Sequence, residues 1–520
     1  MAGARHDIVI VVPVADRPRH LADCLASLAE LKRRYSYTGT VSVLVVDDSL
    51  DAENLARHRA IAEACTGPGL ACRYLSQDAQ RALVDGLPEA LRRQLAGVIG
   101  DGANTAHKGA SITRNIAYLW LNRLPADGRK RLFWFLDSDQ EFRVSIETPE
   151  GEDQPYAIDY FHWLDRIFSE TPTRILTGKV VGDPPVSPAV MAGTFLDDVL
   201  AFLNEMAGLA PDSACTFHGA TAQGTGDAAY HDMAELFGFK AAADPCRYRC
   251  PLAGAHDQAA CFADFAGRLK RFFDGEHPTR RSFYQADDPV AGLTPARTIY
   301  TGNYVFTPEG LDWFIPFAAL KLRMAGPTLG RIIRAEMGDA FVAANLPMLH
   351  KRTVAALGQS EFRPGIERAS DRVDLSGEFE RQYFGDVMLF TMERLTEQGY
   401  PDRQPTPDAV AGMVDGIETG MRQRYKNKQV QIVEKIDRLD TLFNEPGRWW
   451  NSDDCLAGAR ADFSRFIDNM RGNFAADAPG WRLIESARHG AARKAAIGEA
   501  ILRYRDDRDA WRNALREDVR

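Results

Sequence analysis

Two acidic residues, one residue apart, stand directly after a run of five apolar residues. Residues 132–136 read Leu-Phe-Trp-Phe-Leu and are followed by Asp137, Ser138 and Asp139. The run predicts a strand that is buried on both faces. A carboxylate at the end of a buried strand is costly without a counter-charge, which a divalent cation carrying a substrate phosphate would supply. A solvated acidic turn is the simpler alternative.

Acidic residues follow two further apolar runs nearer the N-terminus. The first run, at residues 8–12, leads to Asp16, and the second, at residues 41–46, leads to Asp47. β-Branched runs of this length predict buried strands. Because ligands of open α/β sheets bind beyond the carboxyl ends of the strands, we expect acids from neighbouring strands at one edge of the sheet.

The segments between these runs are predicted to be helices. Asp16 and Pro18 fit the cap and the first turn of a helix. Its apolar face repeats at helical spacing: Leu21, Leu25, Leu28 and Leu31. Strand, helix and strand form a βαβ unit, which predicts a right-handed crossover and a parallel sheet. A second helix, after Gly109, then leads to the strand before Asp137.

Composition and charge are those of a globular protein and exclude several functions. The chain has 520 residues, 45% of them hydrophobic and 26% charged, with a net charge of −9. The sequence has no long run of Lys and Arg, so we do not expect nucleic-acid binding. No apolar run reaches the ~18 residues of a membrane span, and the polar start predicts no signal peptide. The 8 cysteines do not suggest a disulfide scaffold, so we expect a cytoplasmic location with reduced thiols.

Four short motifs occur in an order that resembles a known family. They are Pro-x-x-Asp-Arg-Pro at residues 13–18, Val-Asp-Asp-Ser at 46–49, Gly-Ala-Ser-x-x-Arg-Asn at 109–115 and Leu-Asp-Ser-Asp at 136–139. The order resembles the GT-A glycosyltransferases of family 2, well over residues 7–140 and more loosely over residues 300–352. The resemblance implies a Rossmann-like, mostly parallel sheet with helices on both faces.

The resemblance also implies a division of the chain. Residues 1–355 would form the GT-A domain, with a Cys/His-containing insertion at about 183–290 that shapes the acceptor site. Helical periodicity from about residue 375 onward predicts an α-helical C-terminal domain at residues 356–520. Whether that domain docks an acceptor, braces the catalytic domain or mediates homo-oligomer formation stays open.

The implied reaction is the transfer of a sugar from a nucleotide-diphosphate-sugar donor to a hydroxyl of a saccharide or small-molecule acceptor. The implied donor-binding residues are Pro13, Val14, Asp16, Arg17, Asp47, Asp48, Lys108, Arg114, Asp137 and Ser138. Asp137, Asp139 and His350 would hold Mn²⁺ or Mg²⁺, with His350 donating a neutral imidazole. The cation would neutralise the departing nucleoside diphosphate.

The sugar side and the catalytic base are less defined. Gly302 would permit a close approach and Asn303 would hydrogen-bond a sugar hydroxyl, although a plain turn into a strand is equally compatible. Inverting members of the family carry Gly-Glu-Asp where residues 326–328 here read Gly-Pro-Thr. Either another carboxylate, such as Glu336 or Asp339, is the base, or the enzyme retains configuration and needs none.

The insertion carries a cluster of metal-ligand residue types. Cys246, Cys250, His256 and Cys261 follow the pattern Cys-x3-Cys-x5-His-x4-Cys. Such residues can bind a structural Zn²⁺ in a tetrahedral site. Buried thiols without a metal are the alternative, and the expected compartment argues against a disulfide.

Three other functions remain open. A sugar-1-phosphate nucleotidyltransferase shares the sheet type and the metal chemistry, but its Gly-rich, Arg-containing loop is absent after the first strand. A non-catalytic nucleotide-sugar-binding protein is favoured by Pro327 and Thr328, which replace the usual acids. A receiver domain also uses an acidic pair, yet it places that pair on its first strand rather than its second.

Overall fold

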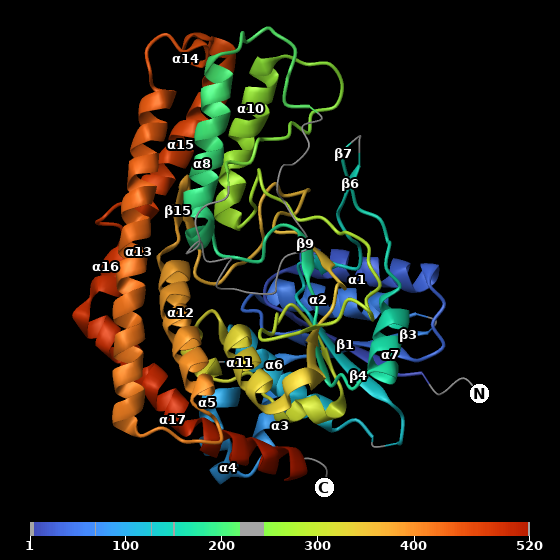
Figure 1. The fold of residues 1–520 in the computed structure, drawn as a ribbon. Coiled ribbons are helices and arrows are strands. Elements are labelled where there is room, and N and C mark those ends of the chain that lie inside the picture. Colours follow the sequence, from blue (N-terminus) through green and yellow to red (C-terminus); the bar gives the residue numbers. More distant parts are fainter. Residues whose placement is uncertain are drawn as a thin grey trace.

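The computed structural model of the protein describes residues 5–67, 69–103, 105–125, 127–148, 151–218 and 244–517. Its largest sheet has eight strands: β1 (Asp7–Val14), β2 (Val41–Asp47), β3 (Leu70–Leu75), β4 (Arg131–Leu136), β8 (Ile175–Thr177), β10 (Thr294–Pro295), β11 (Asn303–Phe306) and β12 (Phe341–Ala343). Their order across the sheet is β10-β12-β8-β11-β4-β1-β2-β3. Figure 1 labels β1, β3 and β4 of this sheet.

The sheet is mostly parallel, as the sequence predicts. β1 pairs in parallel with β2 and with β4, and β2 pairs in parallel with β3. β11 lies antiparallel between β4 and β8. The chain therefore builds outward from β1 through β2 and β3, and then returns to place β4 on the other side of β1. This reversal is a topological switch point, where Rossmann-like sheets bind their ligands.

Alternating side chains explain why the strands read as continuous apolar runs. In β4, Leu132 and Trp134 belong to the core on one face, and Phe133 and Phe135 belong to the core on the other. Successive side chains of a strand point to opposite faces, so a strand covered on both sides needs apolar residues at every position. The sheet is therefore sandwiched between two helical layers.

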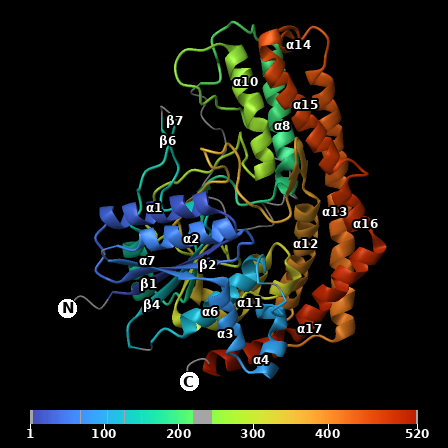
Figure 2. The same cartoon turned by 180° about the vertical axis from the view of Figure 1, so that it is seen from behind.

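The two layers contain the helices of the α/β part. They are α1 (Pro18–Arg34), α2 (Ala52–Cys65), α3 (Gln77–Asp85), α4 (Glu89–Gln94), α5 (Ala96–Ile99), α6 (Ala110–Asn122), α7 (Tyr160–Glu170) and α11 (Ala325–Met337). The leucine stripe of α1 and the apolar face of α7 pack on one side of the sheet (Figure 2). The buried face of α6 and the start of α11 pack on the other.

A small second sheet forms beyond the carboxyl end of β4. Its strands are β5 (Gln140–Glu141), β9 (Val180–Gly182) and β13 (Met348–His350), in the order β5-β13-β9. Gln140 pairs with His350, and the amide of Lys351 donates to the carbonyl of Asp139 at 3.0 Å. This pairing brings the residues after β4 against His350, which lies about 200 residues later in the sequence.

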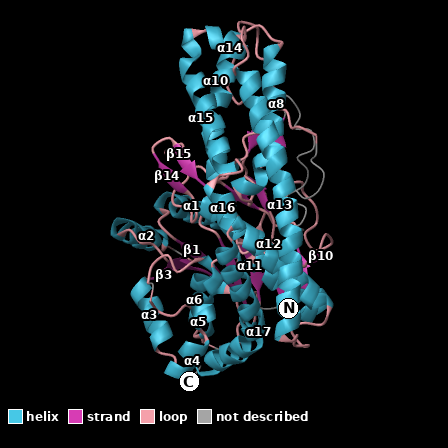
Figure 3. Cartoon of the chain, turned by 90° about the vertical axis from the view of Figure 1, so that its left-hand side faces the viewer, coloured by secondary structure: helices cyan, strands magenta, loops and turns pink. Residues whose placement is uncertain are grey.

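The remaining helices form an elongated part beside the sheet (Figures 1 and 3). Within the described part of the insertion these are α8 (Pro188–Ala207) and α10 (Gln258–Leu269). Six come from the C-terminal part: α12 (Ser376–Glu397), α13 (Pro407–Phe443), α14 (Trp449–Ser452), α15 (Ala457–Phe474), α16 (Pro479–Glu485) and α17 (Ala487–Glu517). The predicted helical character of the C-terminal region is confirmed.

The C-terminal helices pack on the insertion and on the sheet layer. The indole of Trp449 donates to the carbonyl of Met206 in α8, and Trp450 stacks on Phe262 of α10 with ring centroids 5.4 Å apart. At the other end, the indole of Trp511 in α17 donates to the carbonyl of Leu311. One continuous apolar core consequently runs from β1 to α17.

Short elements complete the fold. Two-stranded sheets pair β6 (Ile146–Thr148) with β7 (Gly151–Asp153) and β14 (Glu367–Ala369) with β15 (Arg372–Asp374). Single 3-10 turns occur at Lys270–Asp274, Pro308–Asp312, Ala318–Leu320, Gly338–Ala340 and Asp454–Leu456. Among the described residues, none of the helices combines the length and the apolar character that crossing a lipid bilayer requires.

Candidate active site

A cavity of about 470 Å³ lies at the topological switch point. Pro13 and Val14 line it from the end of β1, and Asp137 and Ser138 line it from the end of β4. The beginnings of α6 and α11 and the segment after β13 close its remaining sides. The cavity therefore occupies the place where strand-end acids were predicted to meet.

Asp139 and His350 face each other at one end of this cavity. Nε2 of His350 lies 3.6 Å from Oδ2 of Asp139. The other ring nitrogen, Nδ1, lies 2.7 Å from the carbonyl oxygen of Asp183, which can only accept a hydrogen bond. In the neutral ring Nδ1 therefore carries the proton, and the lone pair of Nε2 points toward Asp139. A backbone carbonyl orients metal-binding histidines in this way.

The same pair passes a test for cation binding. Oδ1 of Asp139 is buried and has no hydrogen-bond partner among the described residues. A bare imidazole nitrogen and an unsatisfied carboxylate oxygen are ligands for Mn²⁺ or Mg²⁺. Among the described residues, Asp137, Asp139 and His350 do not form a close group of three ligands, and Oδ1 of Asp137 already accepts a hydrogen bond from Arg114. The predicted three-residue metal set is thus reduced to Asp139 and His350.

Arginines surround Asp139. Nη1 of Arg17 donates to Oδ2 of Asp139 at 3.0 Å, and Nη1 of Arg352 donates to the same oxygen at 3.3 Å. Burial by itself would raise the pKa of Asp139, but the positive charges around it, those of Arg17 and Arg352 among them, outweigh burial and hold the pKa well below the ordinary value. The carboxylate is therefore ionised at neutral pH, as a metal ligand must be.

Asp137 has a different partner. A guanidinium nitrogen of Arg114 donates to Oδ1 of Asp137, while Arg114 also donates to the carbonyl of Ala110 at 3.1 Å. The carboxylate reaches close to the backbone of Gly302, where a Cβ atom would lie 2.7 Å from Oδ2 of Asp137. Gly302 does permit a close approach, but what approaches it is Asp137 and the ring of Tyr300.

The cavity wall is strongly basic. Six arginines line it, and together they are called the arginine cluster below: Arg17, Arg114, Arg323, Arg352, Arg363 and Arg381. With Lys321 they make seven cationic side chains against the four carboxylates of Asp48, Asp137, Asp139 and Glu378. Such an excess of positive charge in a hollow favours an anionic ligand.

Arg363 is the most crowded member of the arginine cluster. Its pKa lies well below the ordinary value because it is buried and because Arg352, Arg17 and Arg323 repel its charge. The carboxylate of Glu378 lies 4.0 Å away and is shared with Arg323, which holds it at 2.6 Å. Sequence reasoning missed Arg323, Arg363 and Arg381, because isolated arginines in helical and irregular segments carry no spacing signal.

The segment that carries Arg363 is pinned to the start of α1. The carboxylate of Glu361 accepts the amides of Arg19 at 3.1 Å and His20 at 3.0 Å. It also meets Nδ1 of His20 at 2.7 Å. Burial opposes ionisation of Glu361, but these hydrogen bonds keep its pKa below the ordinary value. A negative charge at a helix N-terminus is stabilising, so the segment is held over the cavity.

A second, larger cavity adjoins the first. It has a volume of about 860 Å³ and shares Ser138 and Asp139 with the cavity at the switch point. Its walls come from β5, from residues 247–253 and 276–283 of the insertion, and from residues after β13. Asp139 therefore stands where two chambers meet, and the insertion forms much of the wall of the second chamber.

Asp16 was predicted to bind the sugar donor, but its side chain stabilises a loop. The carboxylate of Asp16 accepts the amides of Leu50 and Asp51 and the side chain of Asn54, and it meets Nε2 of His107 at 2.6 Å. Asp16 does not line the cavity. Its bonds instead fix the loop after β2, which corrects its predicted role.

Asp47 and Asp48 differ in position, since Asp47 is buried in the fold and Asp48 lines the cavity. Asp47 is fully buried, and Oδ2 accepts from the hydroxyl of Tyr74 at 2.8 Å and meets Nδ1 of His58 at 2.7 Å. Asp48 does line the cavity, but its oxygens accept Nζ of Lys108 at 2.7 Å and the amide of Gly109 at 3.0 Å. Lys108 thus serves as a partner of Asp48, not as a free cation at the site.

Asn303 does not bind a sugar hydroxyl in this arrangement. Its side-chain oxygen accepts the indole N–H of Trp134 at 2.9 Å. Its nitrogen donates to the carbonyls of Lys179 at 3.0 Å and Leu346 at 2.9 Å. With only 1% of its surface exposed, Asn303 ties β11 to β4 and to the segments just before β9 and β13, and its side chain has no group free for a sugar hydroxyl.

The two candidate bases lie away from both chambers. Glu336 accepts the indole N–H of Trp313 and a two-pronged ion pair from Arg508 of α17. Asp339 is 91% exposed and pairs with Arg334 at 3.3 Å. Only the first residues of α11 line the cavity, and Glu336 lies about 15 Å further along the helix axis. The structure removes both residues from the site.

The predicted zinc residues are brought together only in part. Cys250 and His256 do meet, with Sγ 3.2 Å from Nε2. Among the described residues, Cys215 and His218 complete a group of four with them, while Cys261 lies beside Cys215 and Cys250 but outside that group, and Cys246 does not belong to it. The backbone of Ala214 pairs with that of Asp257, and this long-range contact is invisible in the spacing of one segment.

Comparisons with known proteins give the chain no identity. No family model and no curated protein matches it. A mycobacterial protein of known crystal structure is similar over 68% of this chain and 70% of its own, with 13% identity and a TM-score of 0.27. A similarity this weak assigns neither fold nor activity to the chain.

Proposed function

We propose that the protein is a GT-A glycosyltransferase, which moves a sugar from a nucleotide-diphosphate-sugar donor to an acceptor hydroxyl. One observation carries the proposal: Asp139 and His350 meet at the switch point of a Rossmann-like sheet, within the arginine cluster. A cation site beside a basic hollow suits a ligand that carries a diphosphate.

Asp139 and His350 would hold Mn²⁺ or Mg²⁺. Their free atoms, Oδ1 of Asp139 and Nε2 of His350, fit that task. The bound cation would act as a Lewis acid that neutralises charge on the diphosphate. Asp183 supports the site twice, because its carbonyl orients His350 and its carboxylate accepts the amide of Arg352 at 2.8 Å.

The arginine cluster supplies the rest of the charge stabilisation. A diphosphate beside Arg352 and Arg363 would relieve the repulsion that lowers the pKa of Arg363. The negative charge on the leaving diphosphate grows as the sugar departs, and fixed guanidinium groups stabilise such a charge most in a site that excludes water. Arg114 keeps Asp137 turned toward the same cavity.

The second chamber is the proposed acceptor site. It shares Ser138 and Asp139 with the donor cavity, and its wall is polar, with ion pairs such as Lys351–Glu141 at 2.9 Å and Arg281–Asp183 at 2.6 Å. Walls of paired charges suit a hydrophilic acceptor, such as a saccharide or another polar small molecule. The sugar would cross at Ser138 and Asp139, which both chambers share.

A donor screen tests the proposal. We would measure the melting temperature with UDP-, GDP-, dTDP- and CMP-sugars, each with Mn²⁺ and with EDTA, because a ligand of the native state raises it. A donor that binds only with Mn²⁺ would then be incubated with the protein. Release of nucleoside diphosphate is expected. Release of pyrophosphate in the presence of a sugar 1-phosphate would instead indicate a nucleotidyltransferase, and binding without release would indicate a non-catalytic protein.

A further inference from the structure

Four metal-ligand side chains meet in the insertion, apart in sequence from Asp139 and His350. They are Cys215, His218, Cys250 and His256, and one ligand atom from each lies within 4.8 Å of all the others. Four ligands of a tetrahedral zinc ion lie roughly 3–4 Å from one another, since zinc bonds are about 2.0–2.3 Å long. The group therefore approaches the size of a zinc site.

Backbone contacts hold the two ligand pairs together. The amide of Cys215 donates to the carbonyl of His256 at 2.9 Å, and the amide of Cys250 donates to the carbonyl of Phe217 at 3.1 Å. These two bonds lock the segment of Cys215 against that of Cys250. The ligands thus converge through the fold itself, and not through the chance placement of flexible side chains.

The imidazole of His256 is oriented as a zinc ligand is. Nδ1 of His256 lies 3.0 Å from the carbonyl oxygen of Gly254, which can accept its proton. Nε2 of the same ring then presents its lone pair 3.2 Å from Sγ of Cys250. Nε2 of His218 lies 3.2 Å from Nδ1 of His256, so His218 is near the group but faces the other nitrogen of that ring. Zinc-bound histidines commonly donate their other N–H to a carbonyl in this manner.

The chemistry of the four ligand atoms indicates which metal would bind. Two thiols and two imidazoles form the Cys₂His₂ set of structural zinc sites, whereas Mg²⁺, Mn²⁺ and Ca²⁺ prefer oxygen ligands. The pairs Cys-x2-His and Cys-x5-His also lie at spacings close to those of zinc-binding modules. Cys261 adds a third thiol beside Cys215 and Cys250, which makes the surroundings still more thiol-rich.

We propose that Cys215, His218, Cys250 and His256 bind one structural Zn²⁺. Four protein ligands close the coordination sphere, so the ion has no open position for a substrate. The site joins residues on either side of positions 219–249, and it stands in the wall of the second chamber, which His218, Arg247, Arg249 and Cys250 line. The zinc would therefore stabilise that wall. The proposal of a zinc site does not require that the protein transfers sugars.

Metal analysis of the full-length chain tests the zinc site. The protein, produced with zinc in the medium, is expected to retain one equivalent of zinc after gel filtration, as measured by mass spectrometry of the element. Cys250→Ser and His256→Gln are expected to lose it, while the exposed Cys455→Ser keeps it. A folded wild-type chain without stoichiometric zinc would overturn the proposal, and so would full zinc in Cys250→Ser.

Cobalt substitution tests the zinc site in the wild-type chain, so it does not depend on whether Cys250→Ser or His256→Gln folds. Chelation followed by Co²⁺ is expected to produce the visible bands of tetrahedral cobalt and the ultraviolet charge-transfer band of cobalt–thiolate bonds. Octahedral cobalt spectra without that thiolate band would contradict the site. Alkylation in denaturant and EDTA without reductant adds a second check: thiols released from zinc would react, whereas a Cys215–Cys250 disulfide would stay protected and would rule out zinc binding there.

Discussion

At the scale of single residues, chemistry-capable side chains divide into those aimed at the cavity and those used by the fold. Asp139 has a free, buried oxygen, whereas Asp16 and Asn303 have every side-chain oxygen or nitrogen engaged by protein groups. The acid motif after β4 and His350 were predictable from sequence. The occupation of Asp16 and Asn303 was not, because their partners lie far away in the chain.

Asn303 should matter for stability and not for donor affinity. Asn303→Ala would leave the indole N–H of Trp134 and two buried carbonyls without their partner. Unsatisfied buried groups of this kind should lower the free energy of unfolding by roughly 3 kcal/mol. Urea denaturation measures the loss, with the exposed Asn427→Ala as the control. A stable variant with weakened donor binding would restore the acceptor role that the structure rejects.

Arg363 should show the opposite behaviour. Arg363→Met removes a charge that Arg352, Arg17 and Arg323 repel, and this relief offsets the lost hydrogen bond to the carbonyl of Asp274, so the melting temperature should fall less than in Asn303→Ala. Donor affinity should fall at least tenfold, because hydrogen bonds to charged groups are worth about 1.5–3 kcal/mol. Calorimetric titration of the donor checks this, with the exposed Arg488→Met as the control. Equal affinity in both variants would remove Arg363 from the diphosphate site.

At the scale of elements, strands were easier to predict than the contacts between them. The apolar runs of β1, β2 and β4 identify buried strands, and their acidic ends identify the functional edge. The pairing of β5 with β13 sets His350 beside Asp139, yet two- and three-residue strands carry too little pattern to be read. The arginines of α12 and of the segment before it reach the cavity only through tertiary packing.

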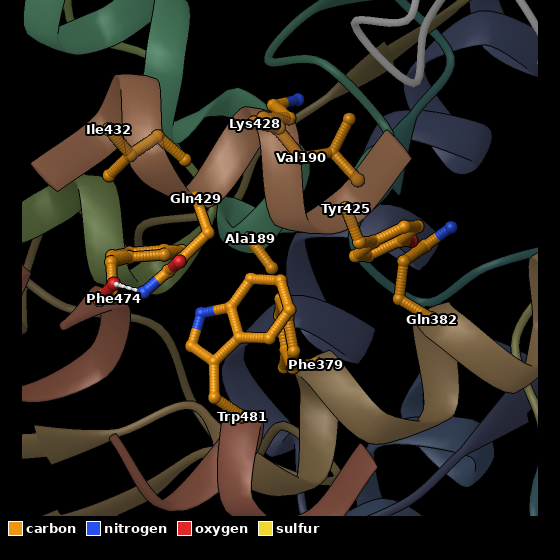
Figure 4. A pocket seen from close by; sticks show the side chains of 10 residues that line it. All are labelled: Ala189, Val190, Phe379, Gln382, Tyr425, Lys428, Gln429, Ile432, Phe474 and Trp481. Atoms are coloured by element: carbon orange, nitrogen blue, oxygen red, sulfur yellow. Dashed lines mark hydrogen bonds between the residues drawn. The ribbon is translucent and has the colours of Figure 1, made fainter. Parts of the chain in front are cut away.

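The interface between α12 and α13 contains buried polar groups, although the apolar periodicity of these helices predicts an apolar interface. A small cavity of about 20 Å³, room for roughly one water molecule, lies where α8, α12, α13 and α16 meet (Figure 4). Gln382, Tyr425 and Lys428 line it among apolar residues. Gln382 and Tyr425 also hydrogen-bond Asp386, which is fully buried.

Asp386 makes stability depend on pH. Burial raises its pKa to about 7, although Tyr425, Gln382, Lys428 and Arg323 favour the ionised form. The folded state therefore holds a proton that the unfolded state releases at lower pH, so stability falls as pH rises from about 4 to about 7. Between pH 5 and pH 7 the wild type should lose about 2 kcal/mol relative to Asp386→Asn.

Melting curves at several pH values measure that difference. Lys428 is the nearest confounding group, and its pKa of about 8 places its titration above the tested window. Comparing wild type with Asp386→Asn cancels the remaining groups. A constant difference between the two proteins from pH 5 to pH 7 would show that Asp386 is ionised throughout this range.

At the scale of the whole molecule, the C-terminal helices complete the site and the core. Glu378 and Arg381 of α12 line the donor cavity. Arg508 of α17 binds Glu336, and Lys435 of α13 pairs with Asp197 of α8 at 2.7 Å. Sequence periodicity predicts that these segments are helices. It gives no sign that they share one core with the sheet, because periodicity shows which face is buried but not the partner.

Truncation after residue 375 tests whether the α/β part folds without the C-terminal helices. A chain that ends at residue 375 loses the helices that cover α8, α10 and α11, along with two residues of the cavity wall. Exposing that much apolar surface should make the fragment aggregate and abolish donor binding. Gel filtration and near-ultraviolet circular dichroism report the outcome. A soluble, cooperatively folded fragment that binds the donor would mark the C-terminal region as an independent domain.

The central claim, that Asp139 and His350 hold the cation that carries the donor diphosphate, is tested most directly by calorimetric titration of the donor in Mn²⁺ and in EDTA. Wild type and the exposed control Asp402→Asn should bind far more tightly in Mn²⁺. Asp139→Asn and His350→Gln should bind equally weakly in both buffers. Full manganese dependence in either of these two variants would contradict the account.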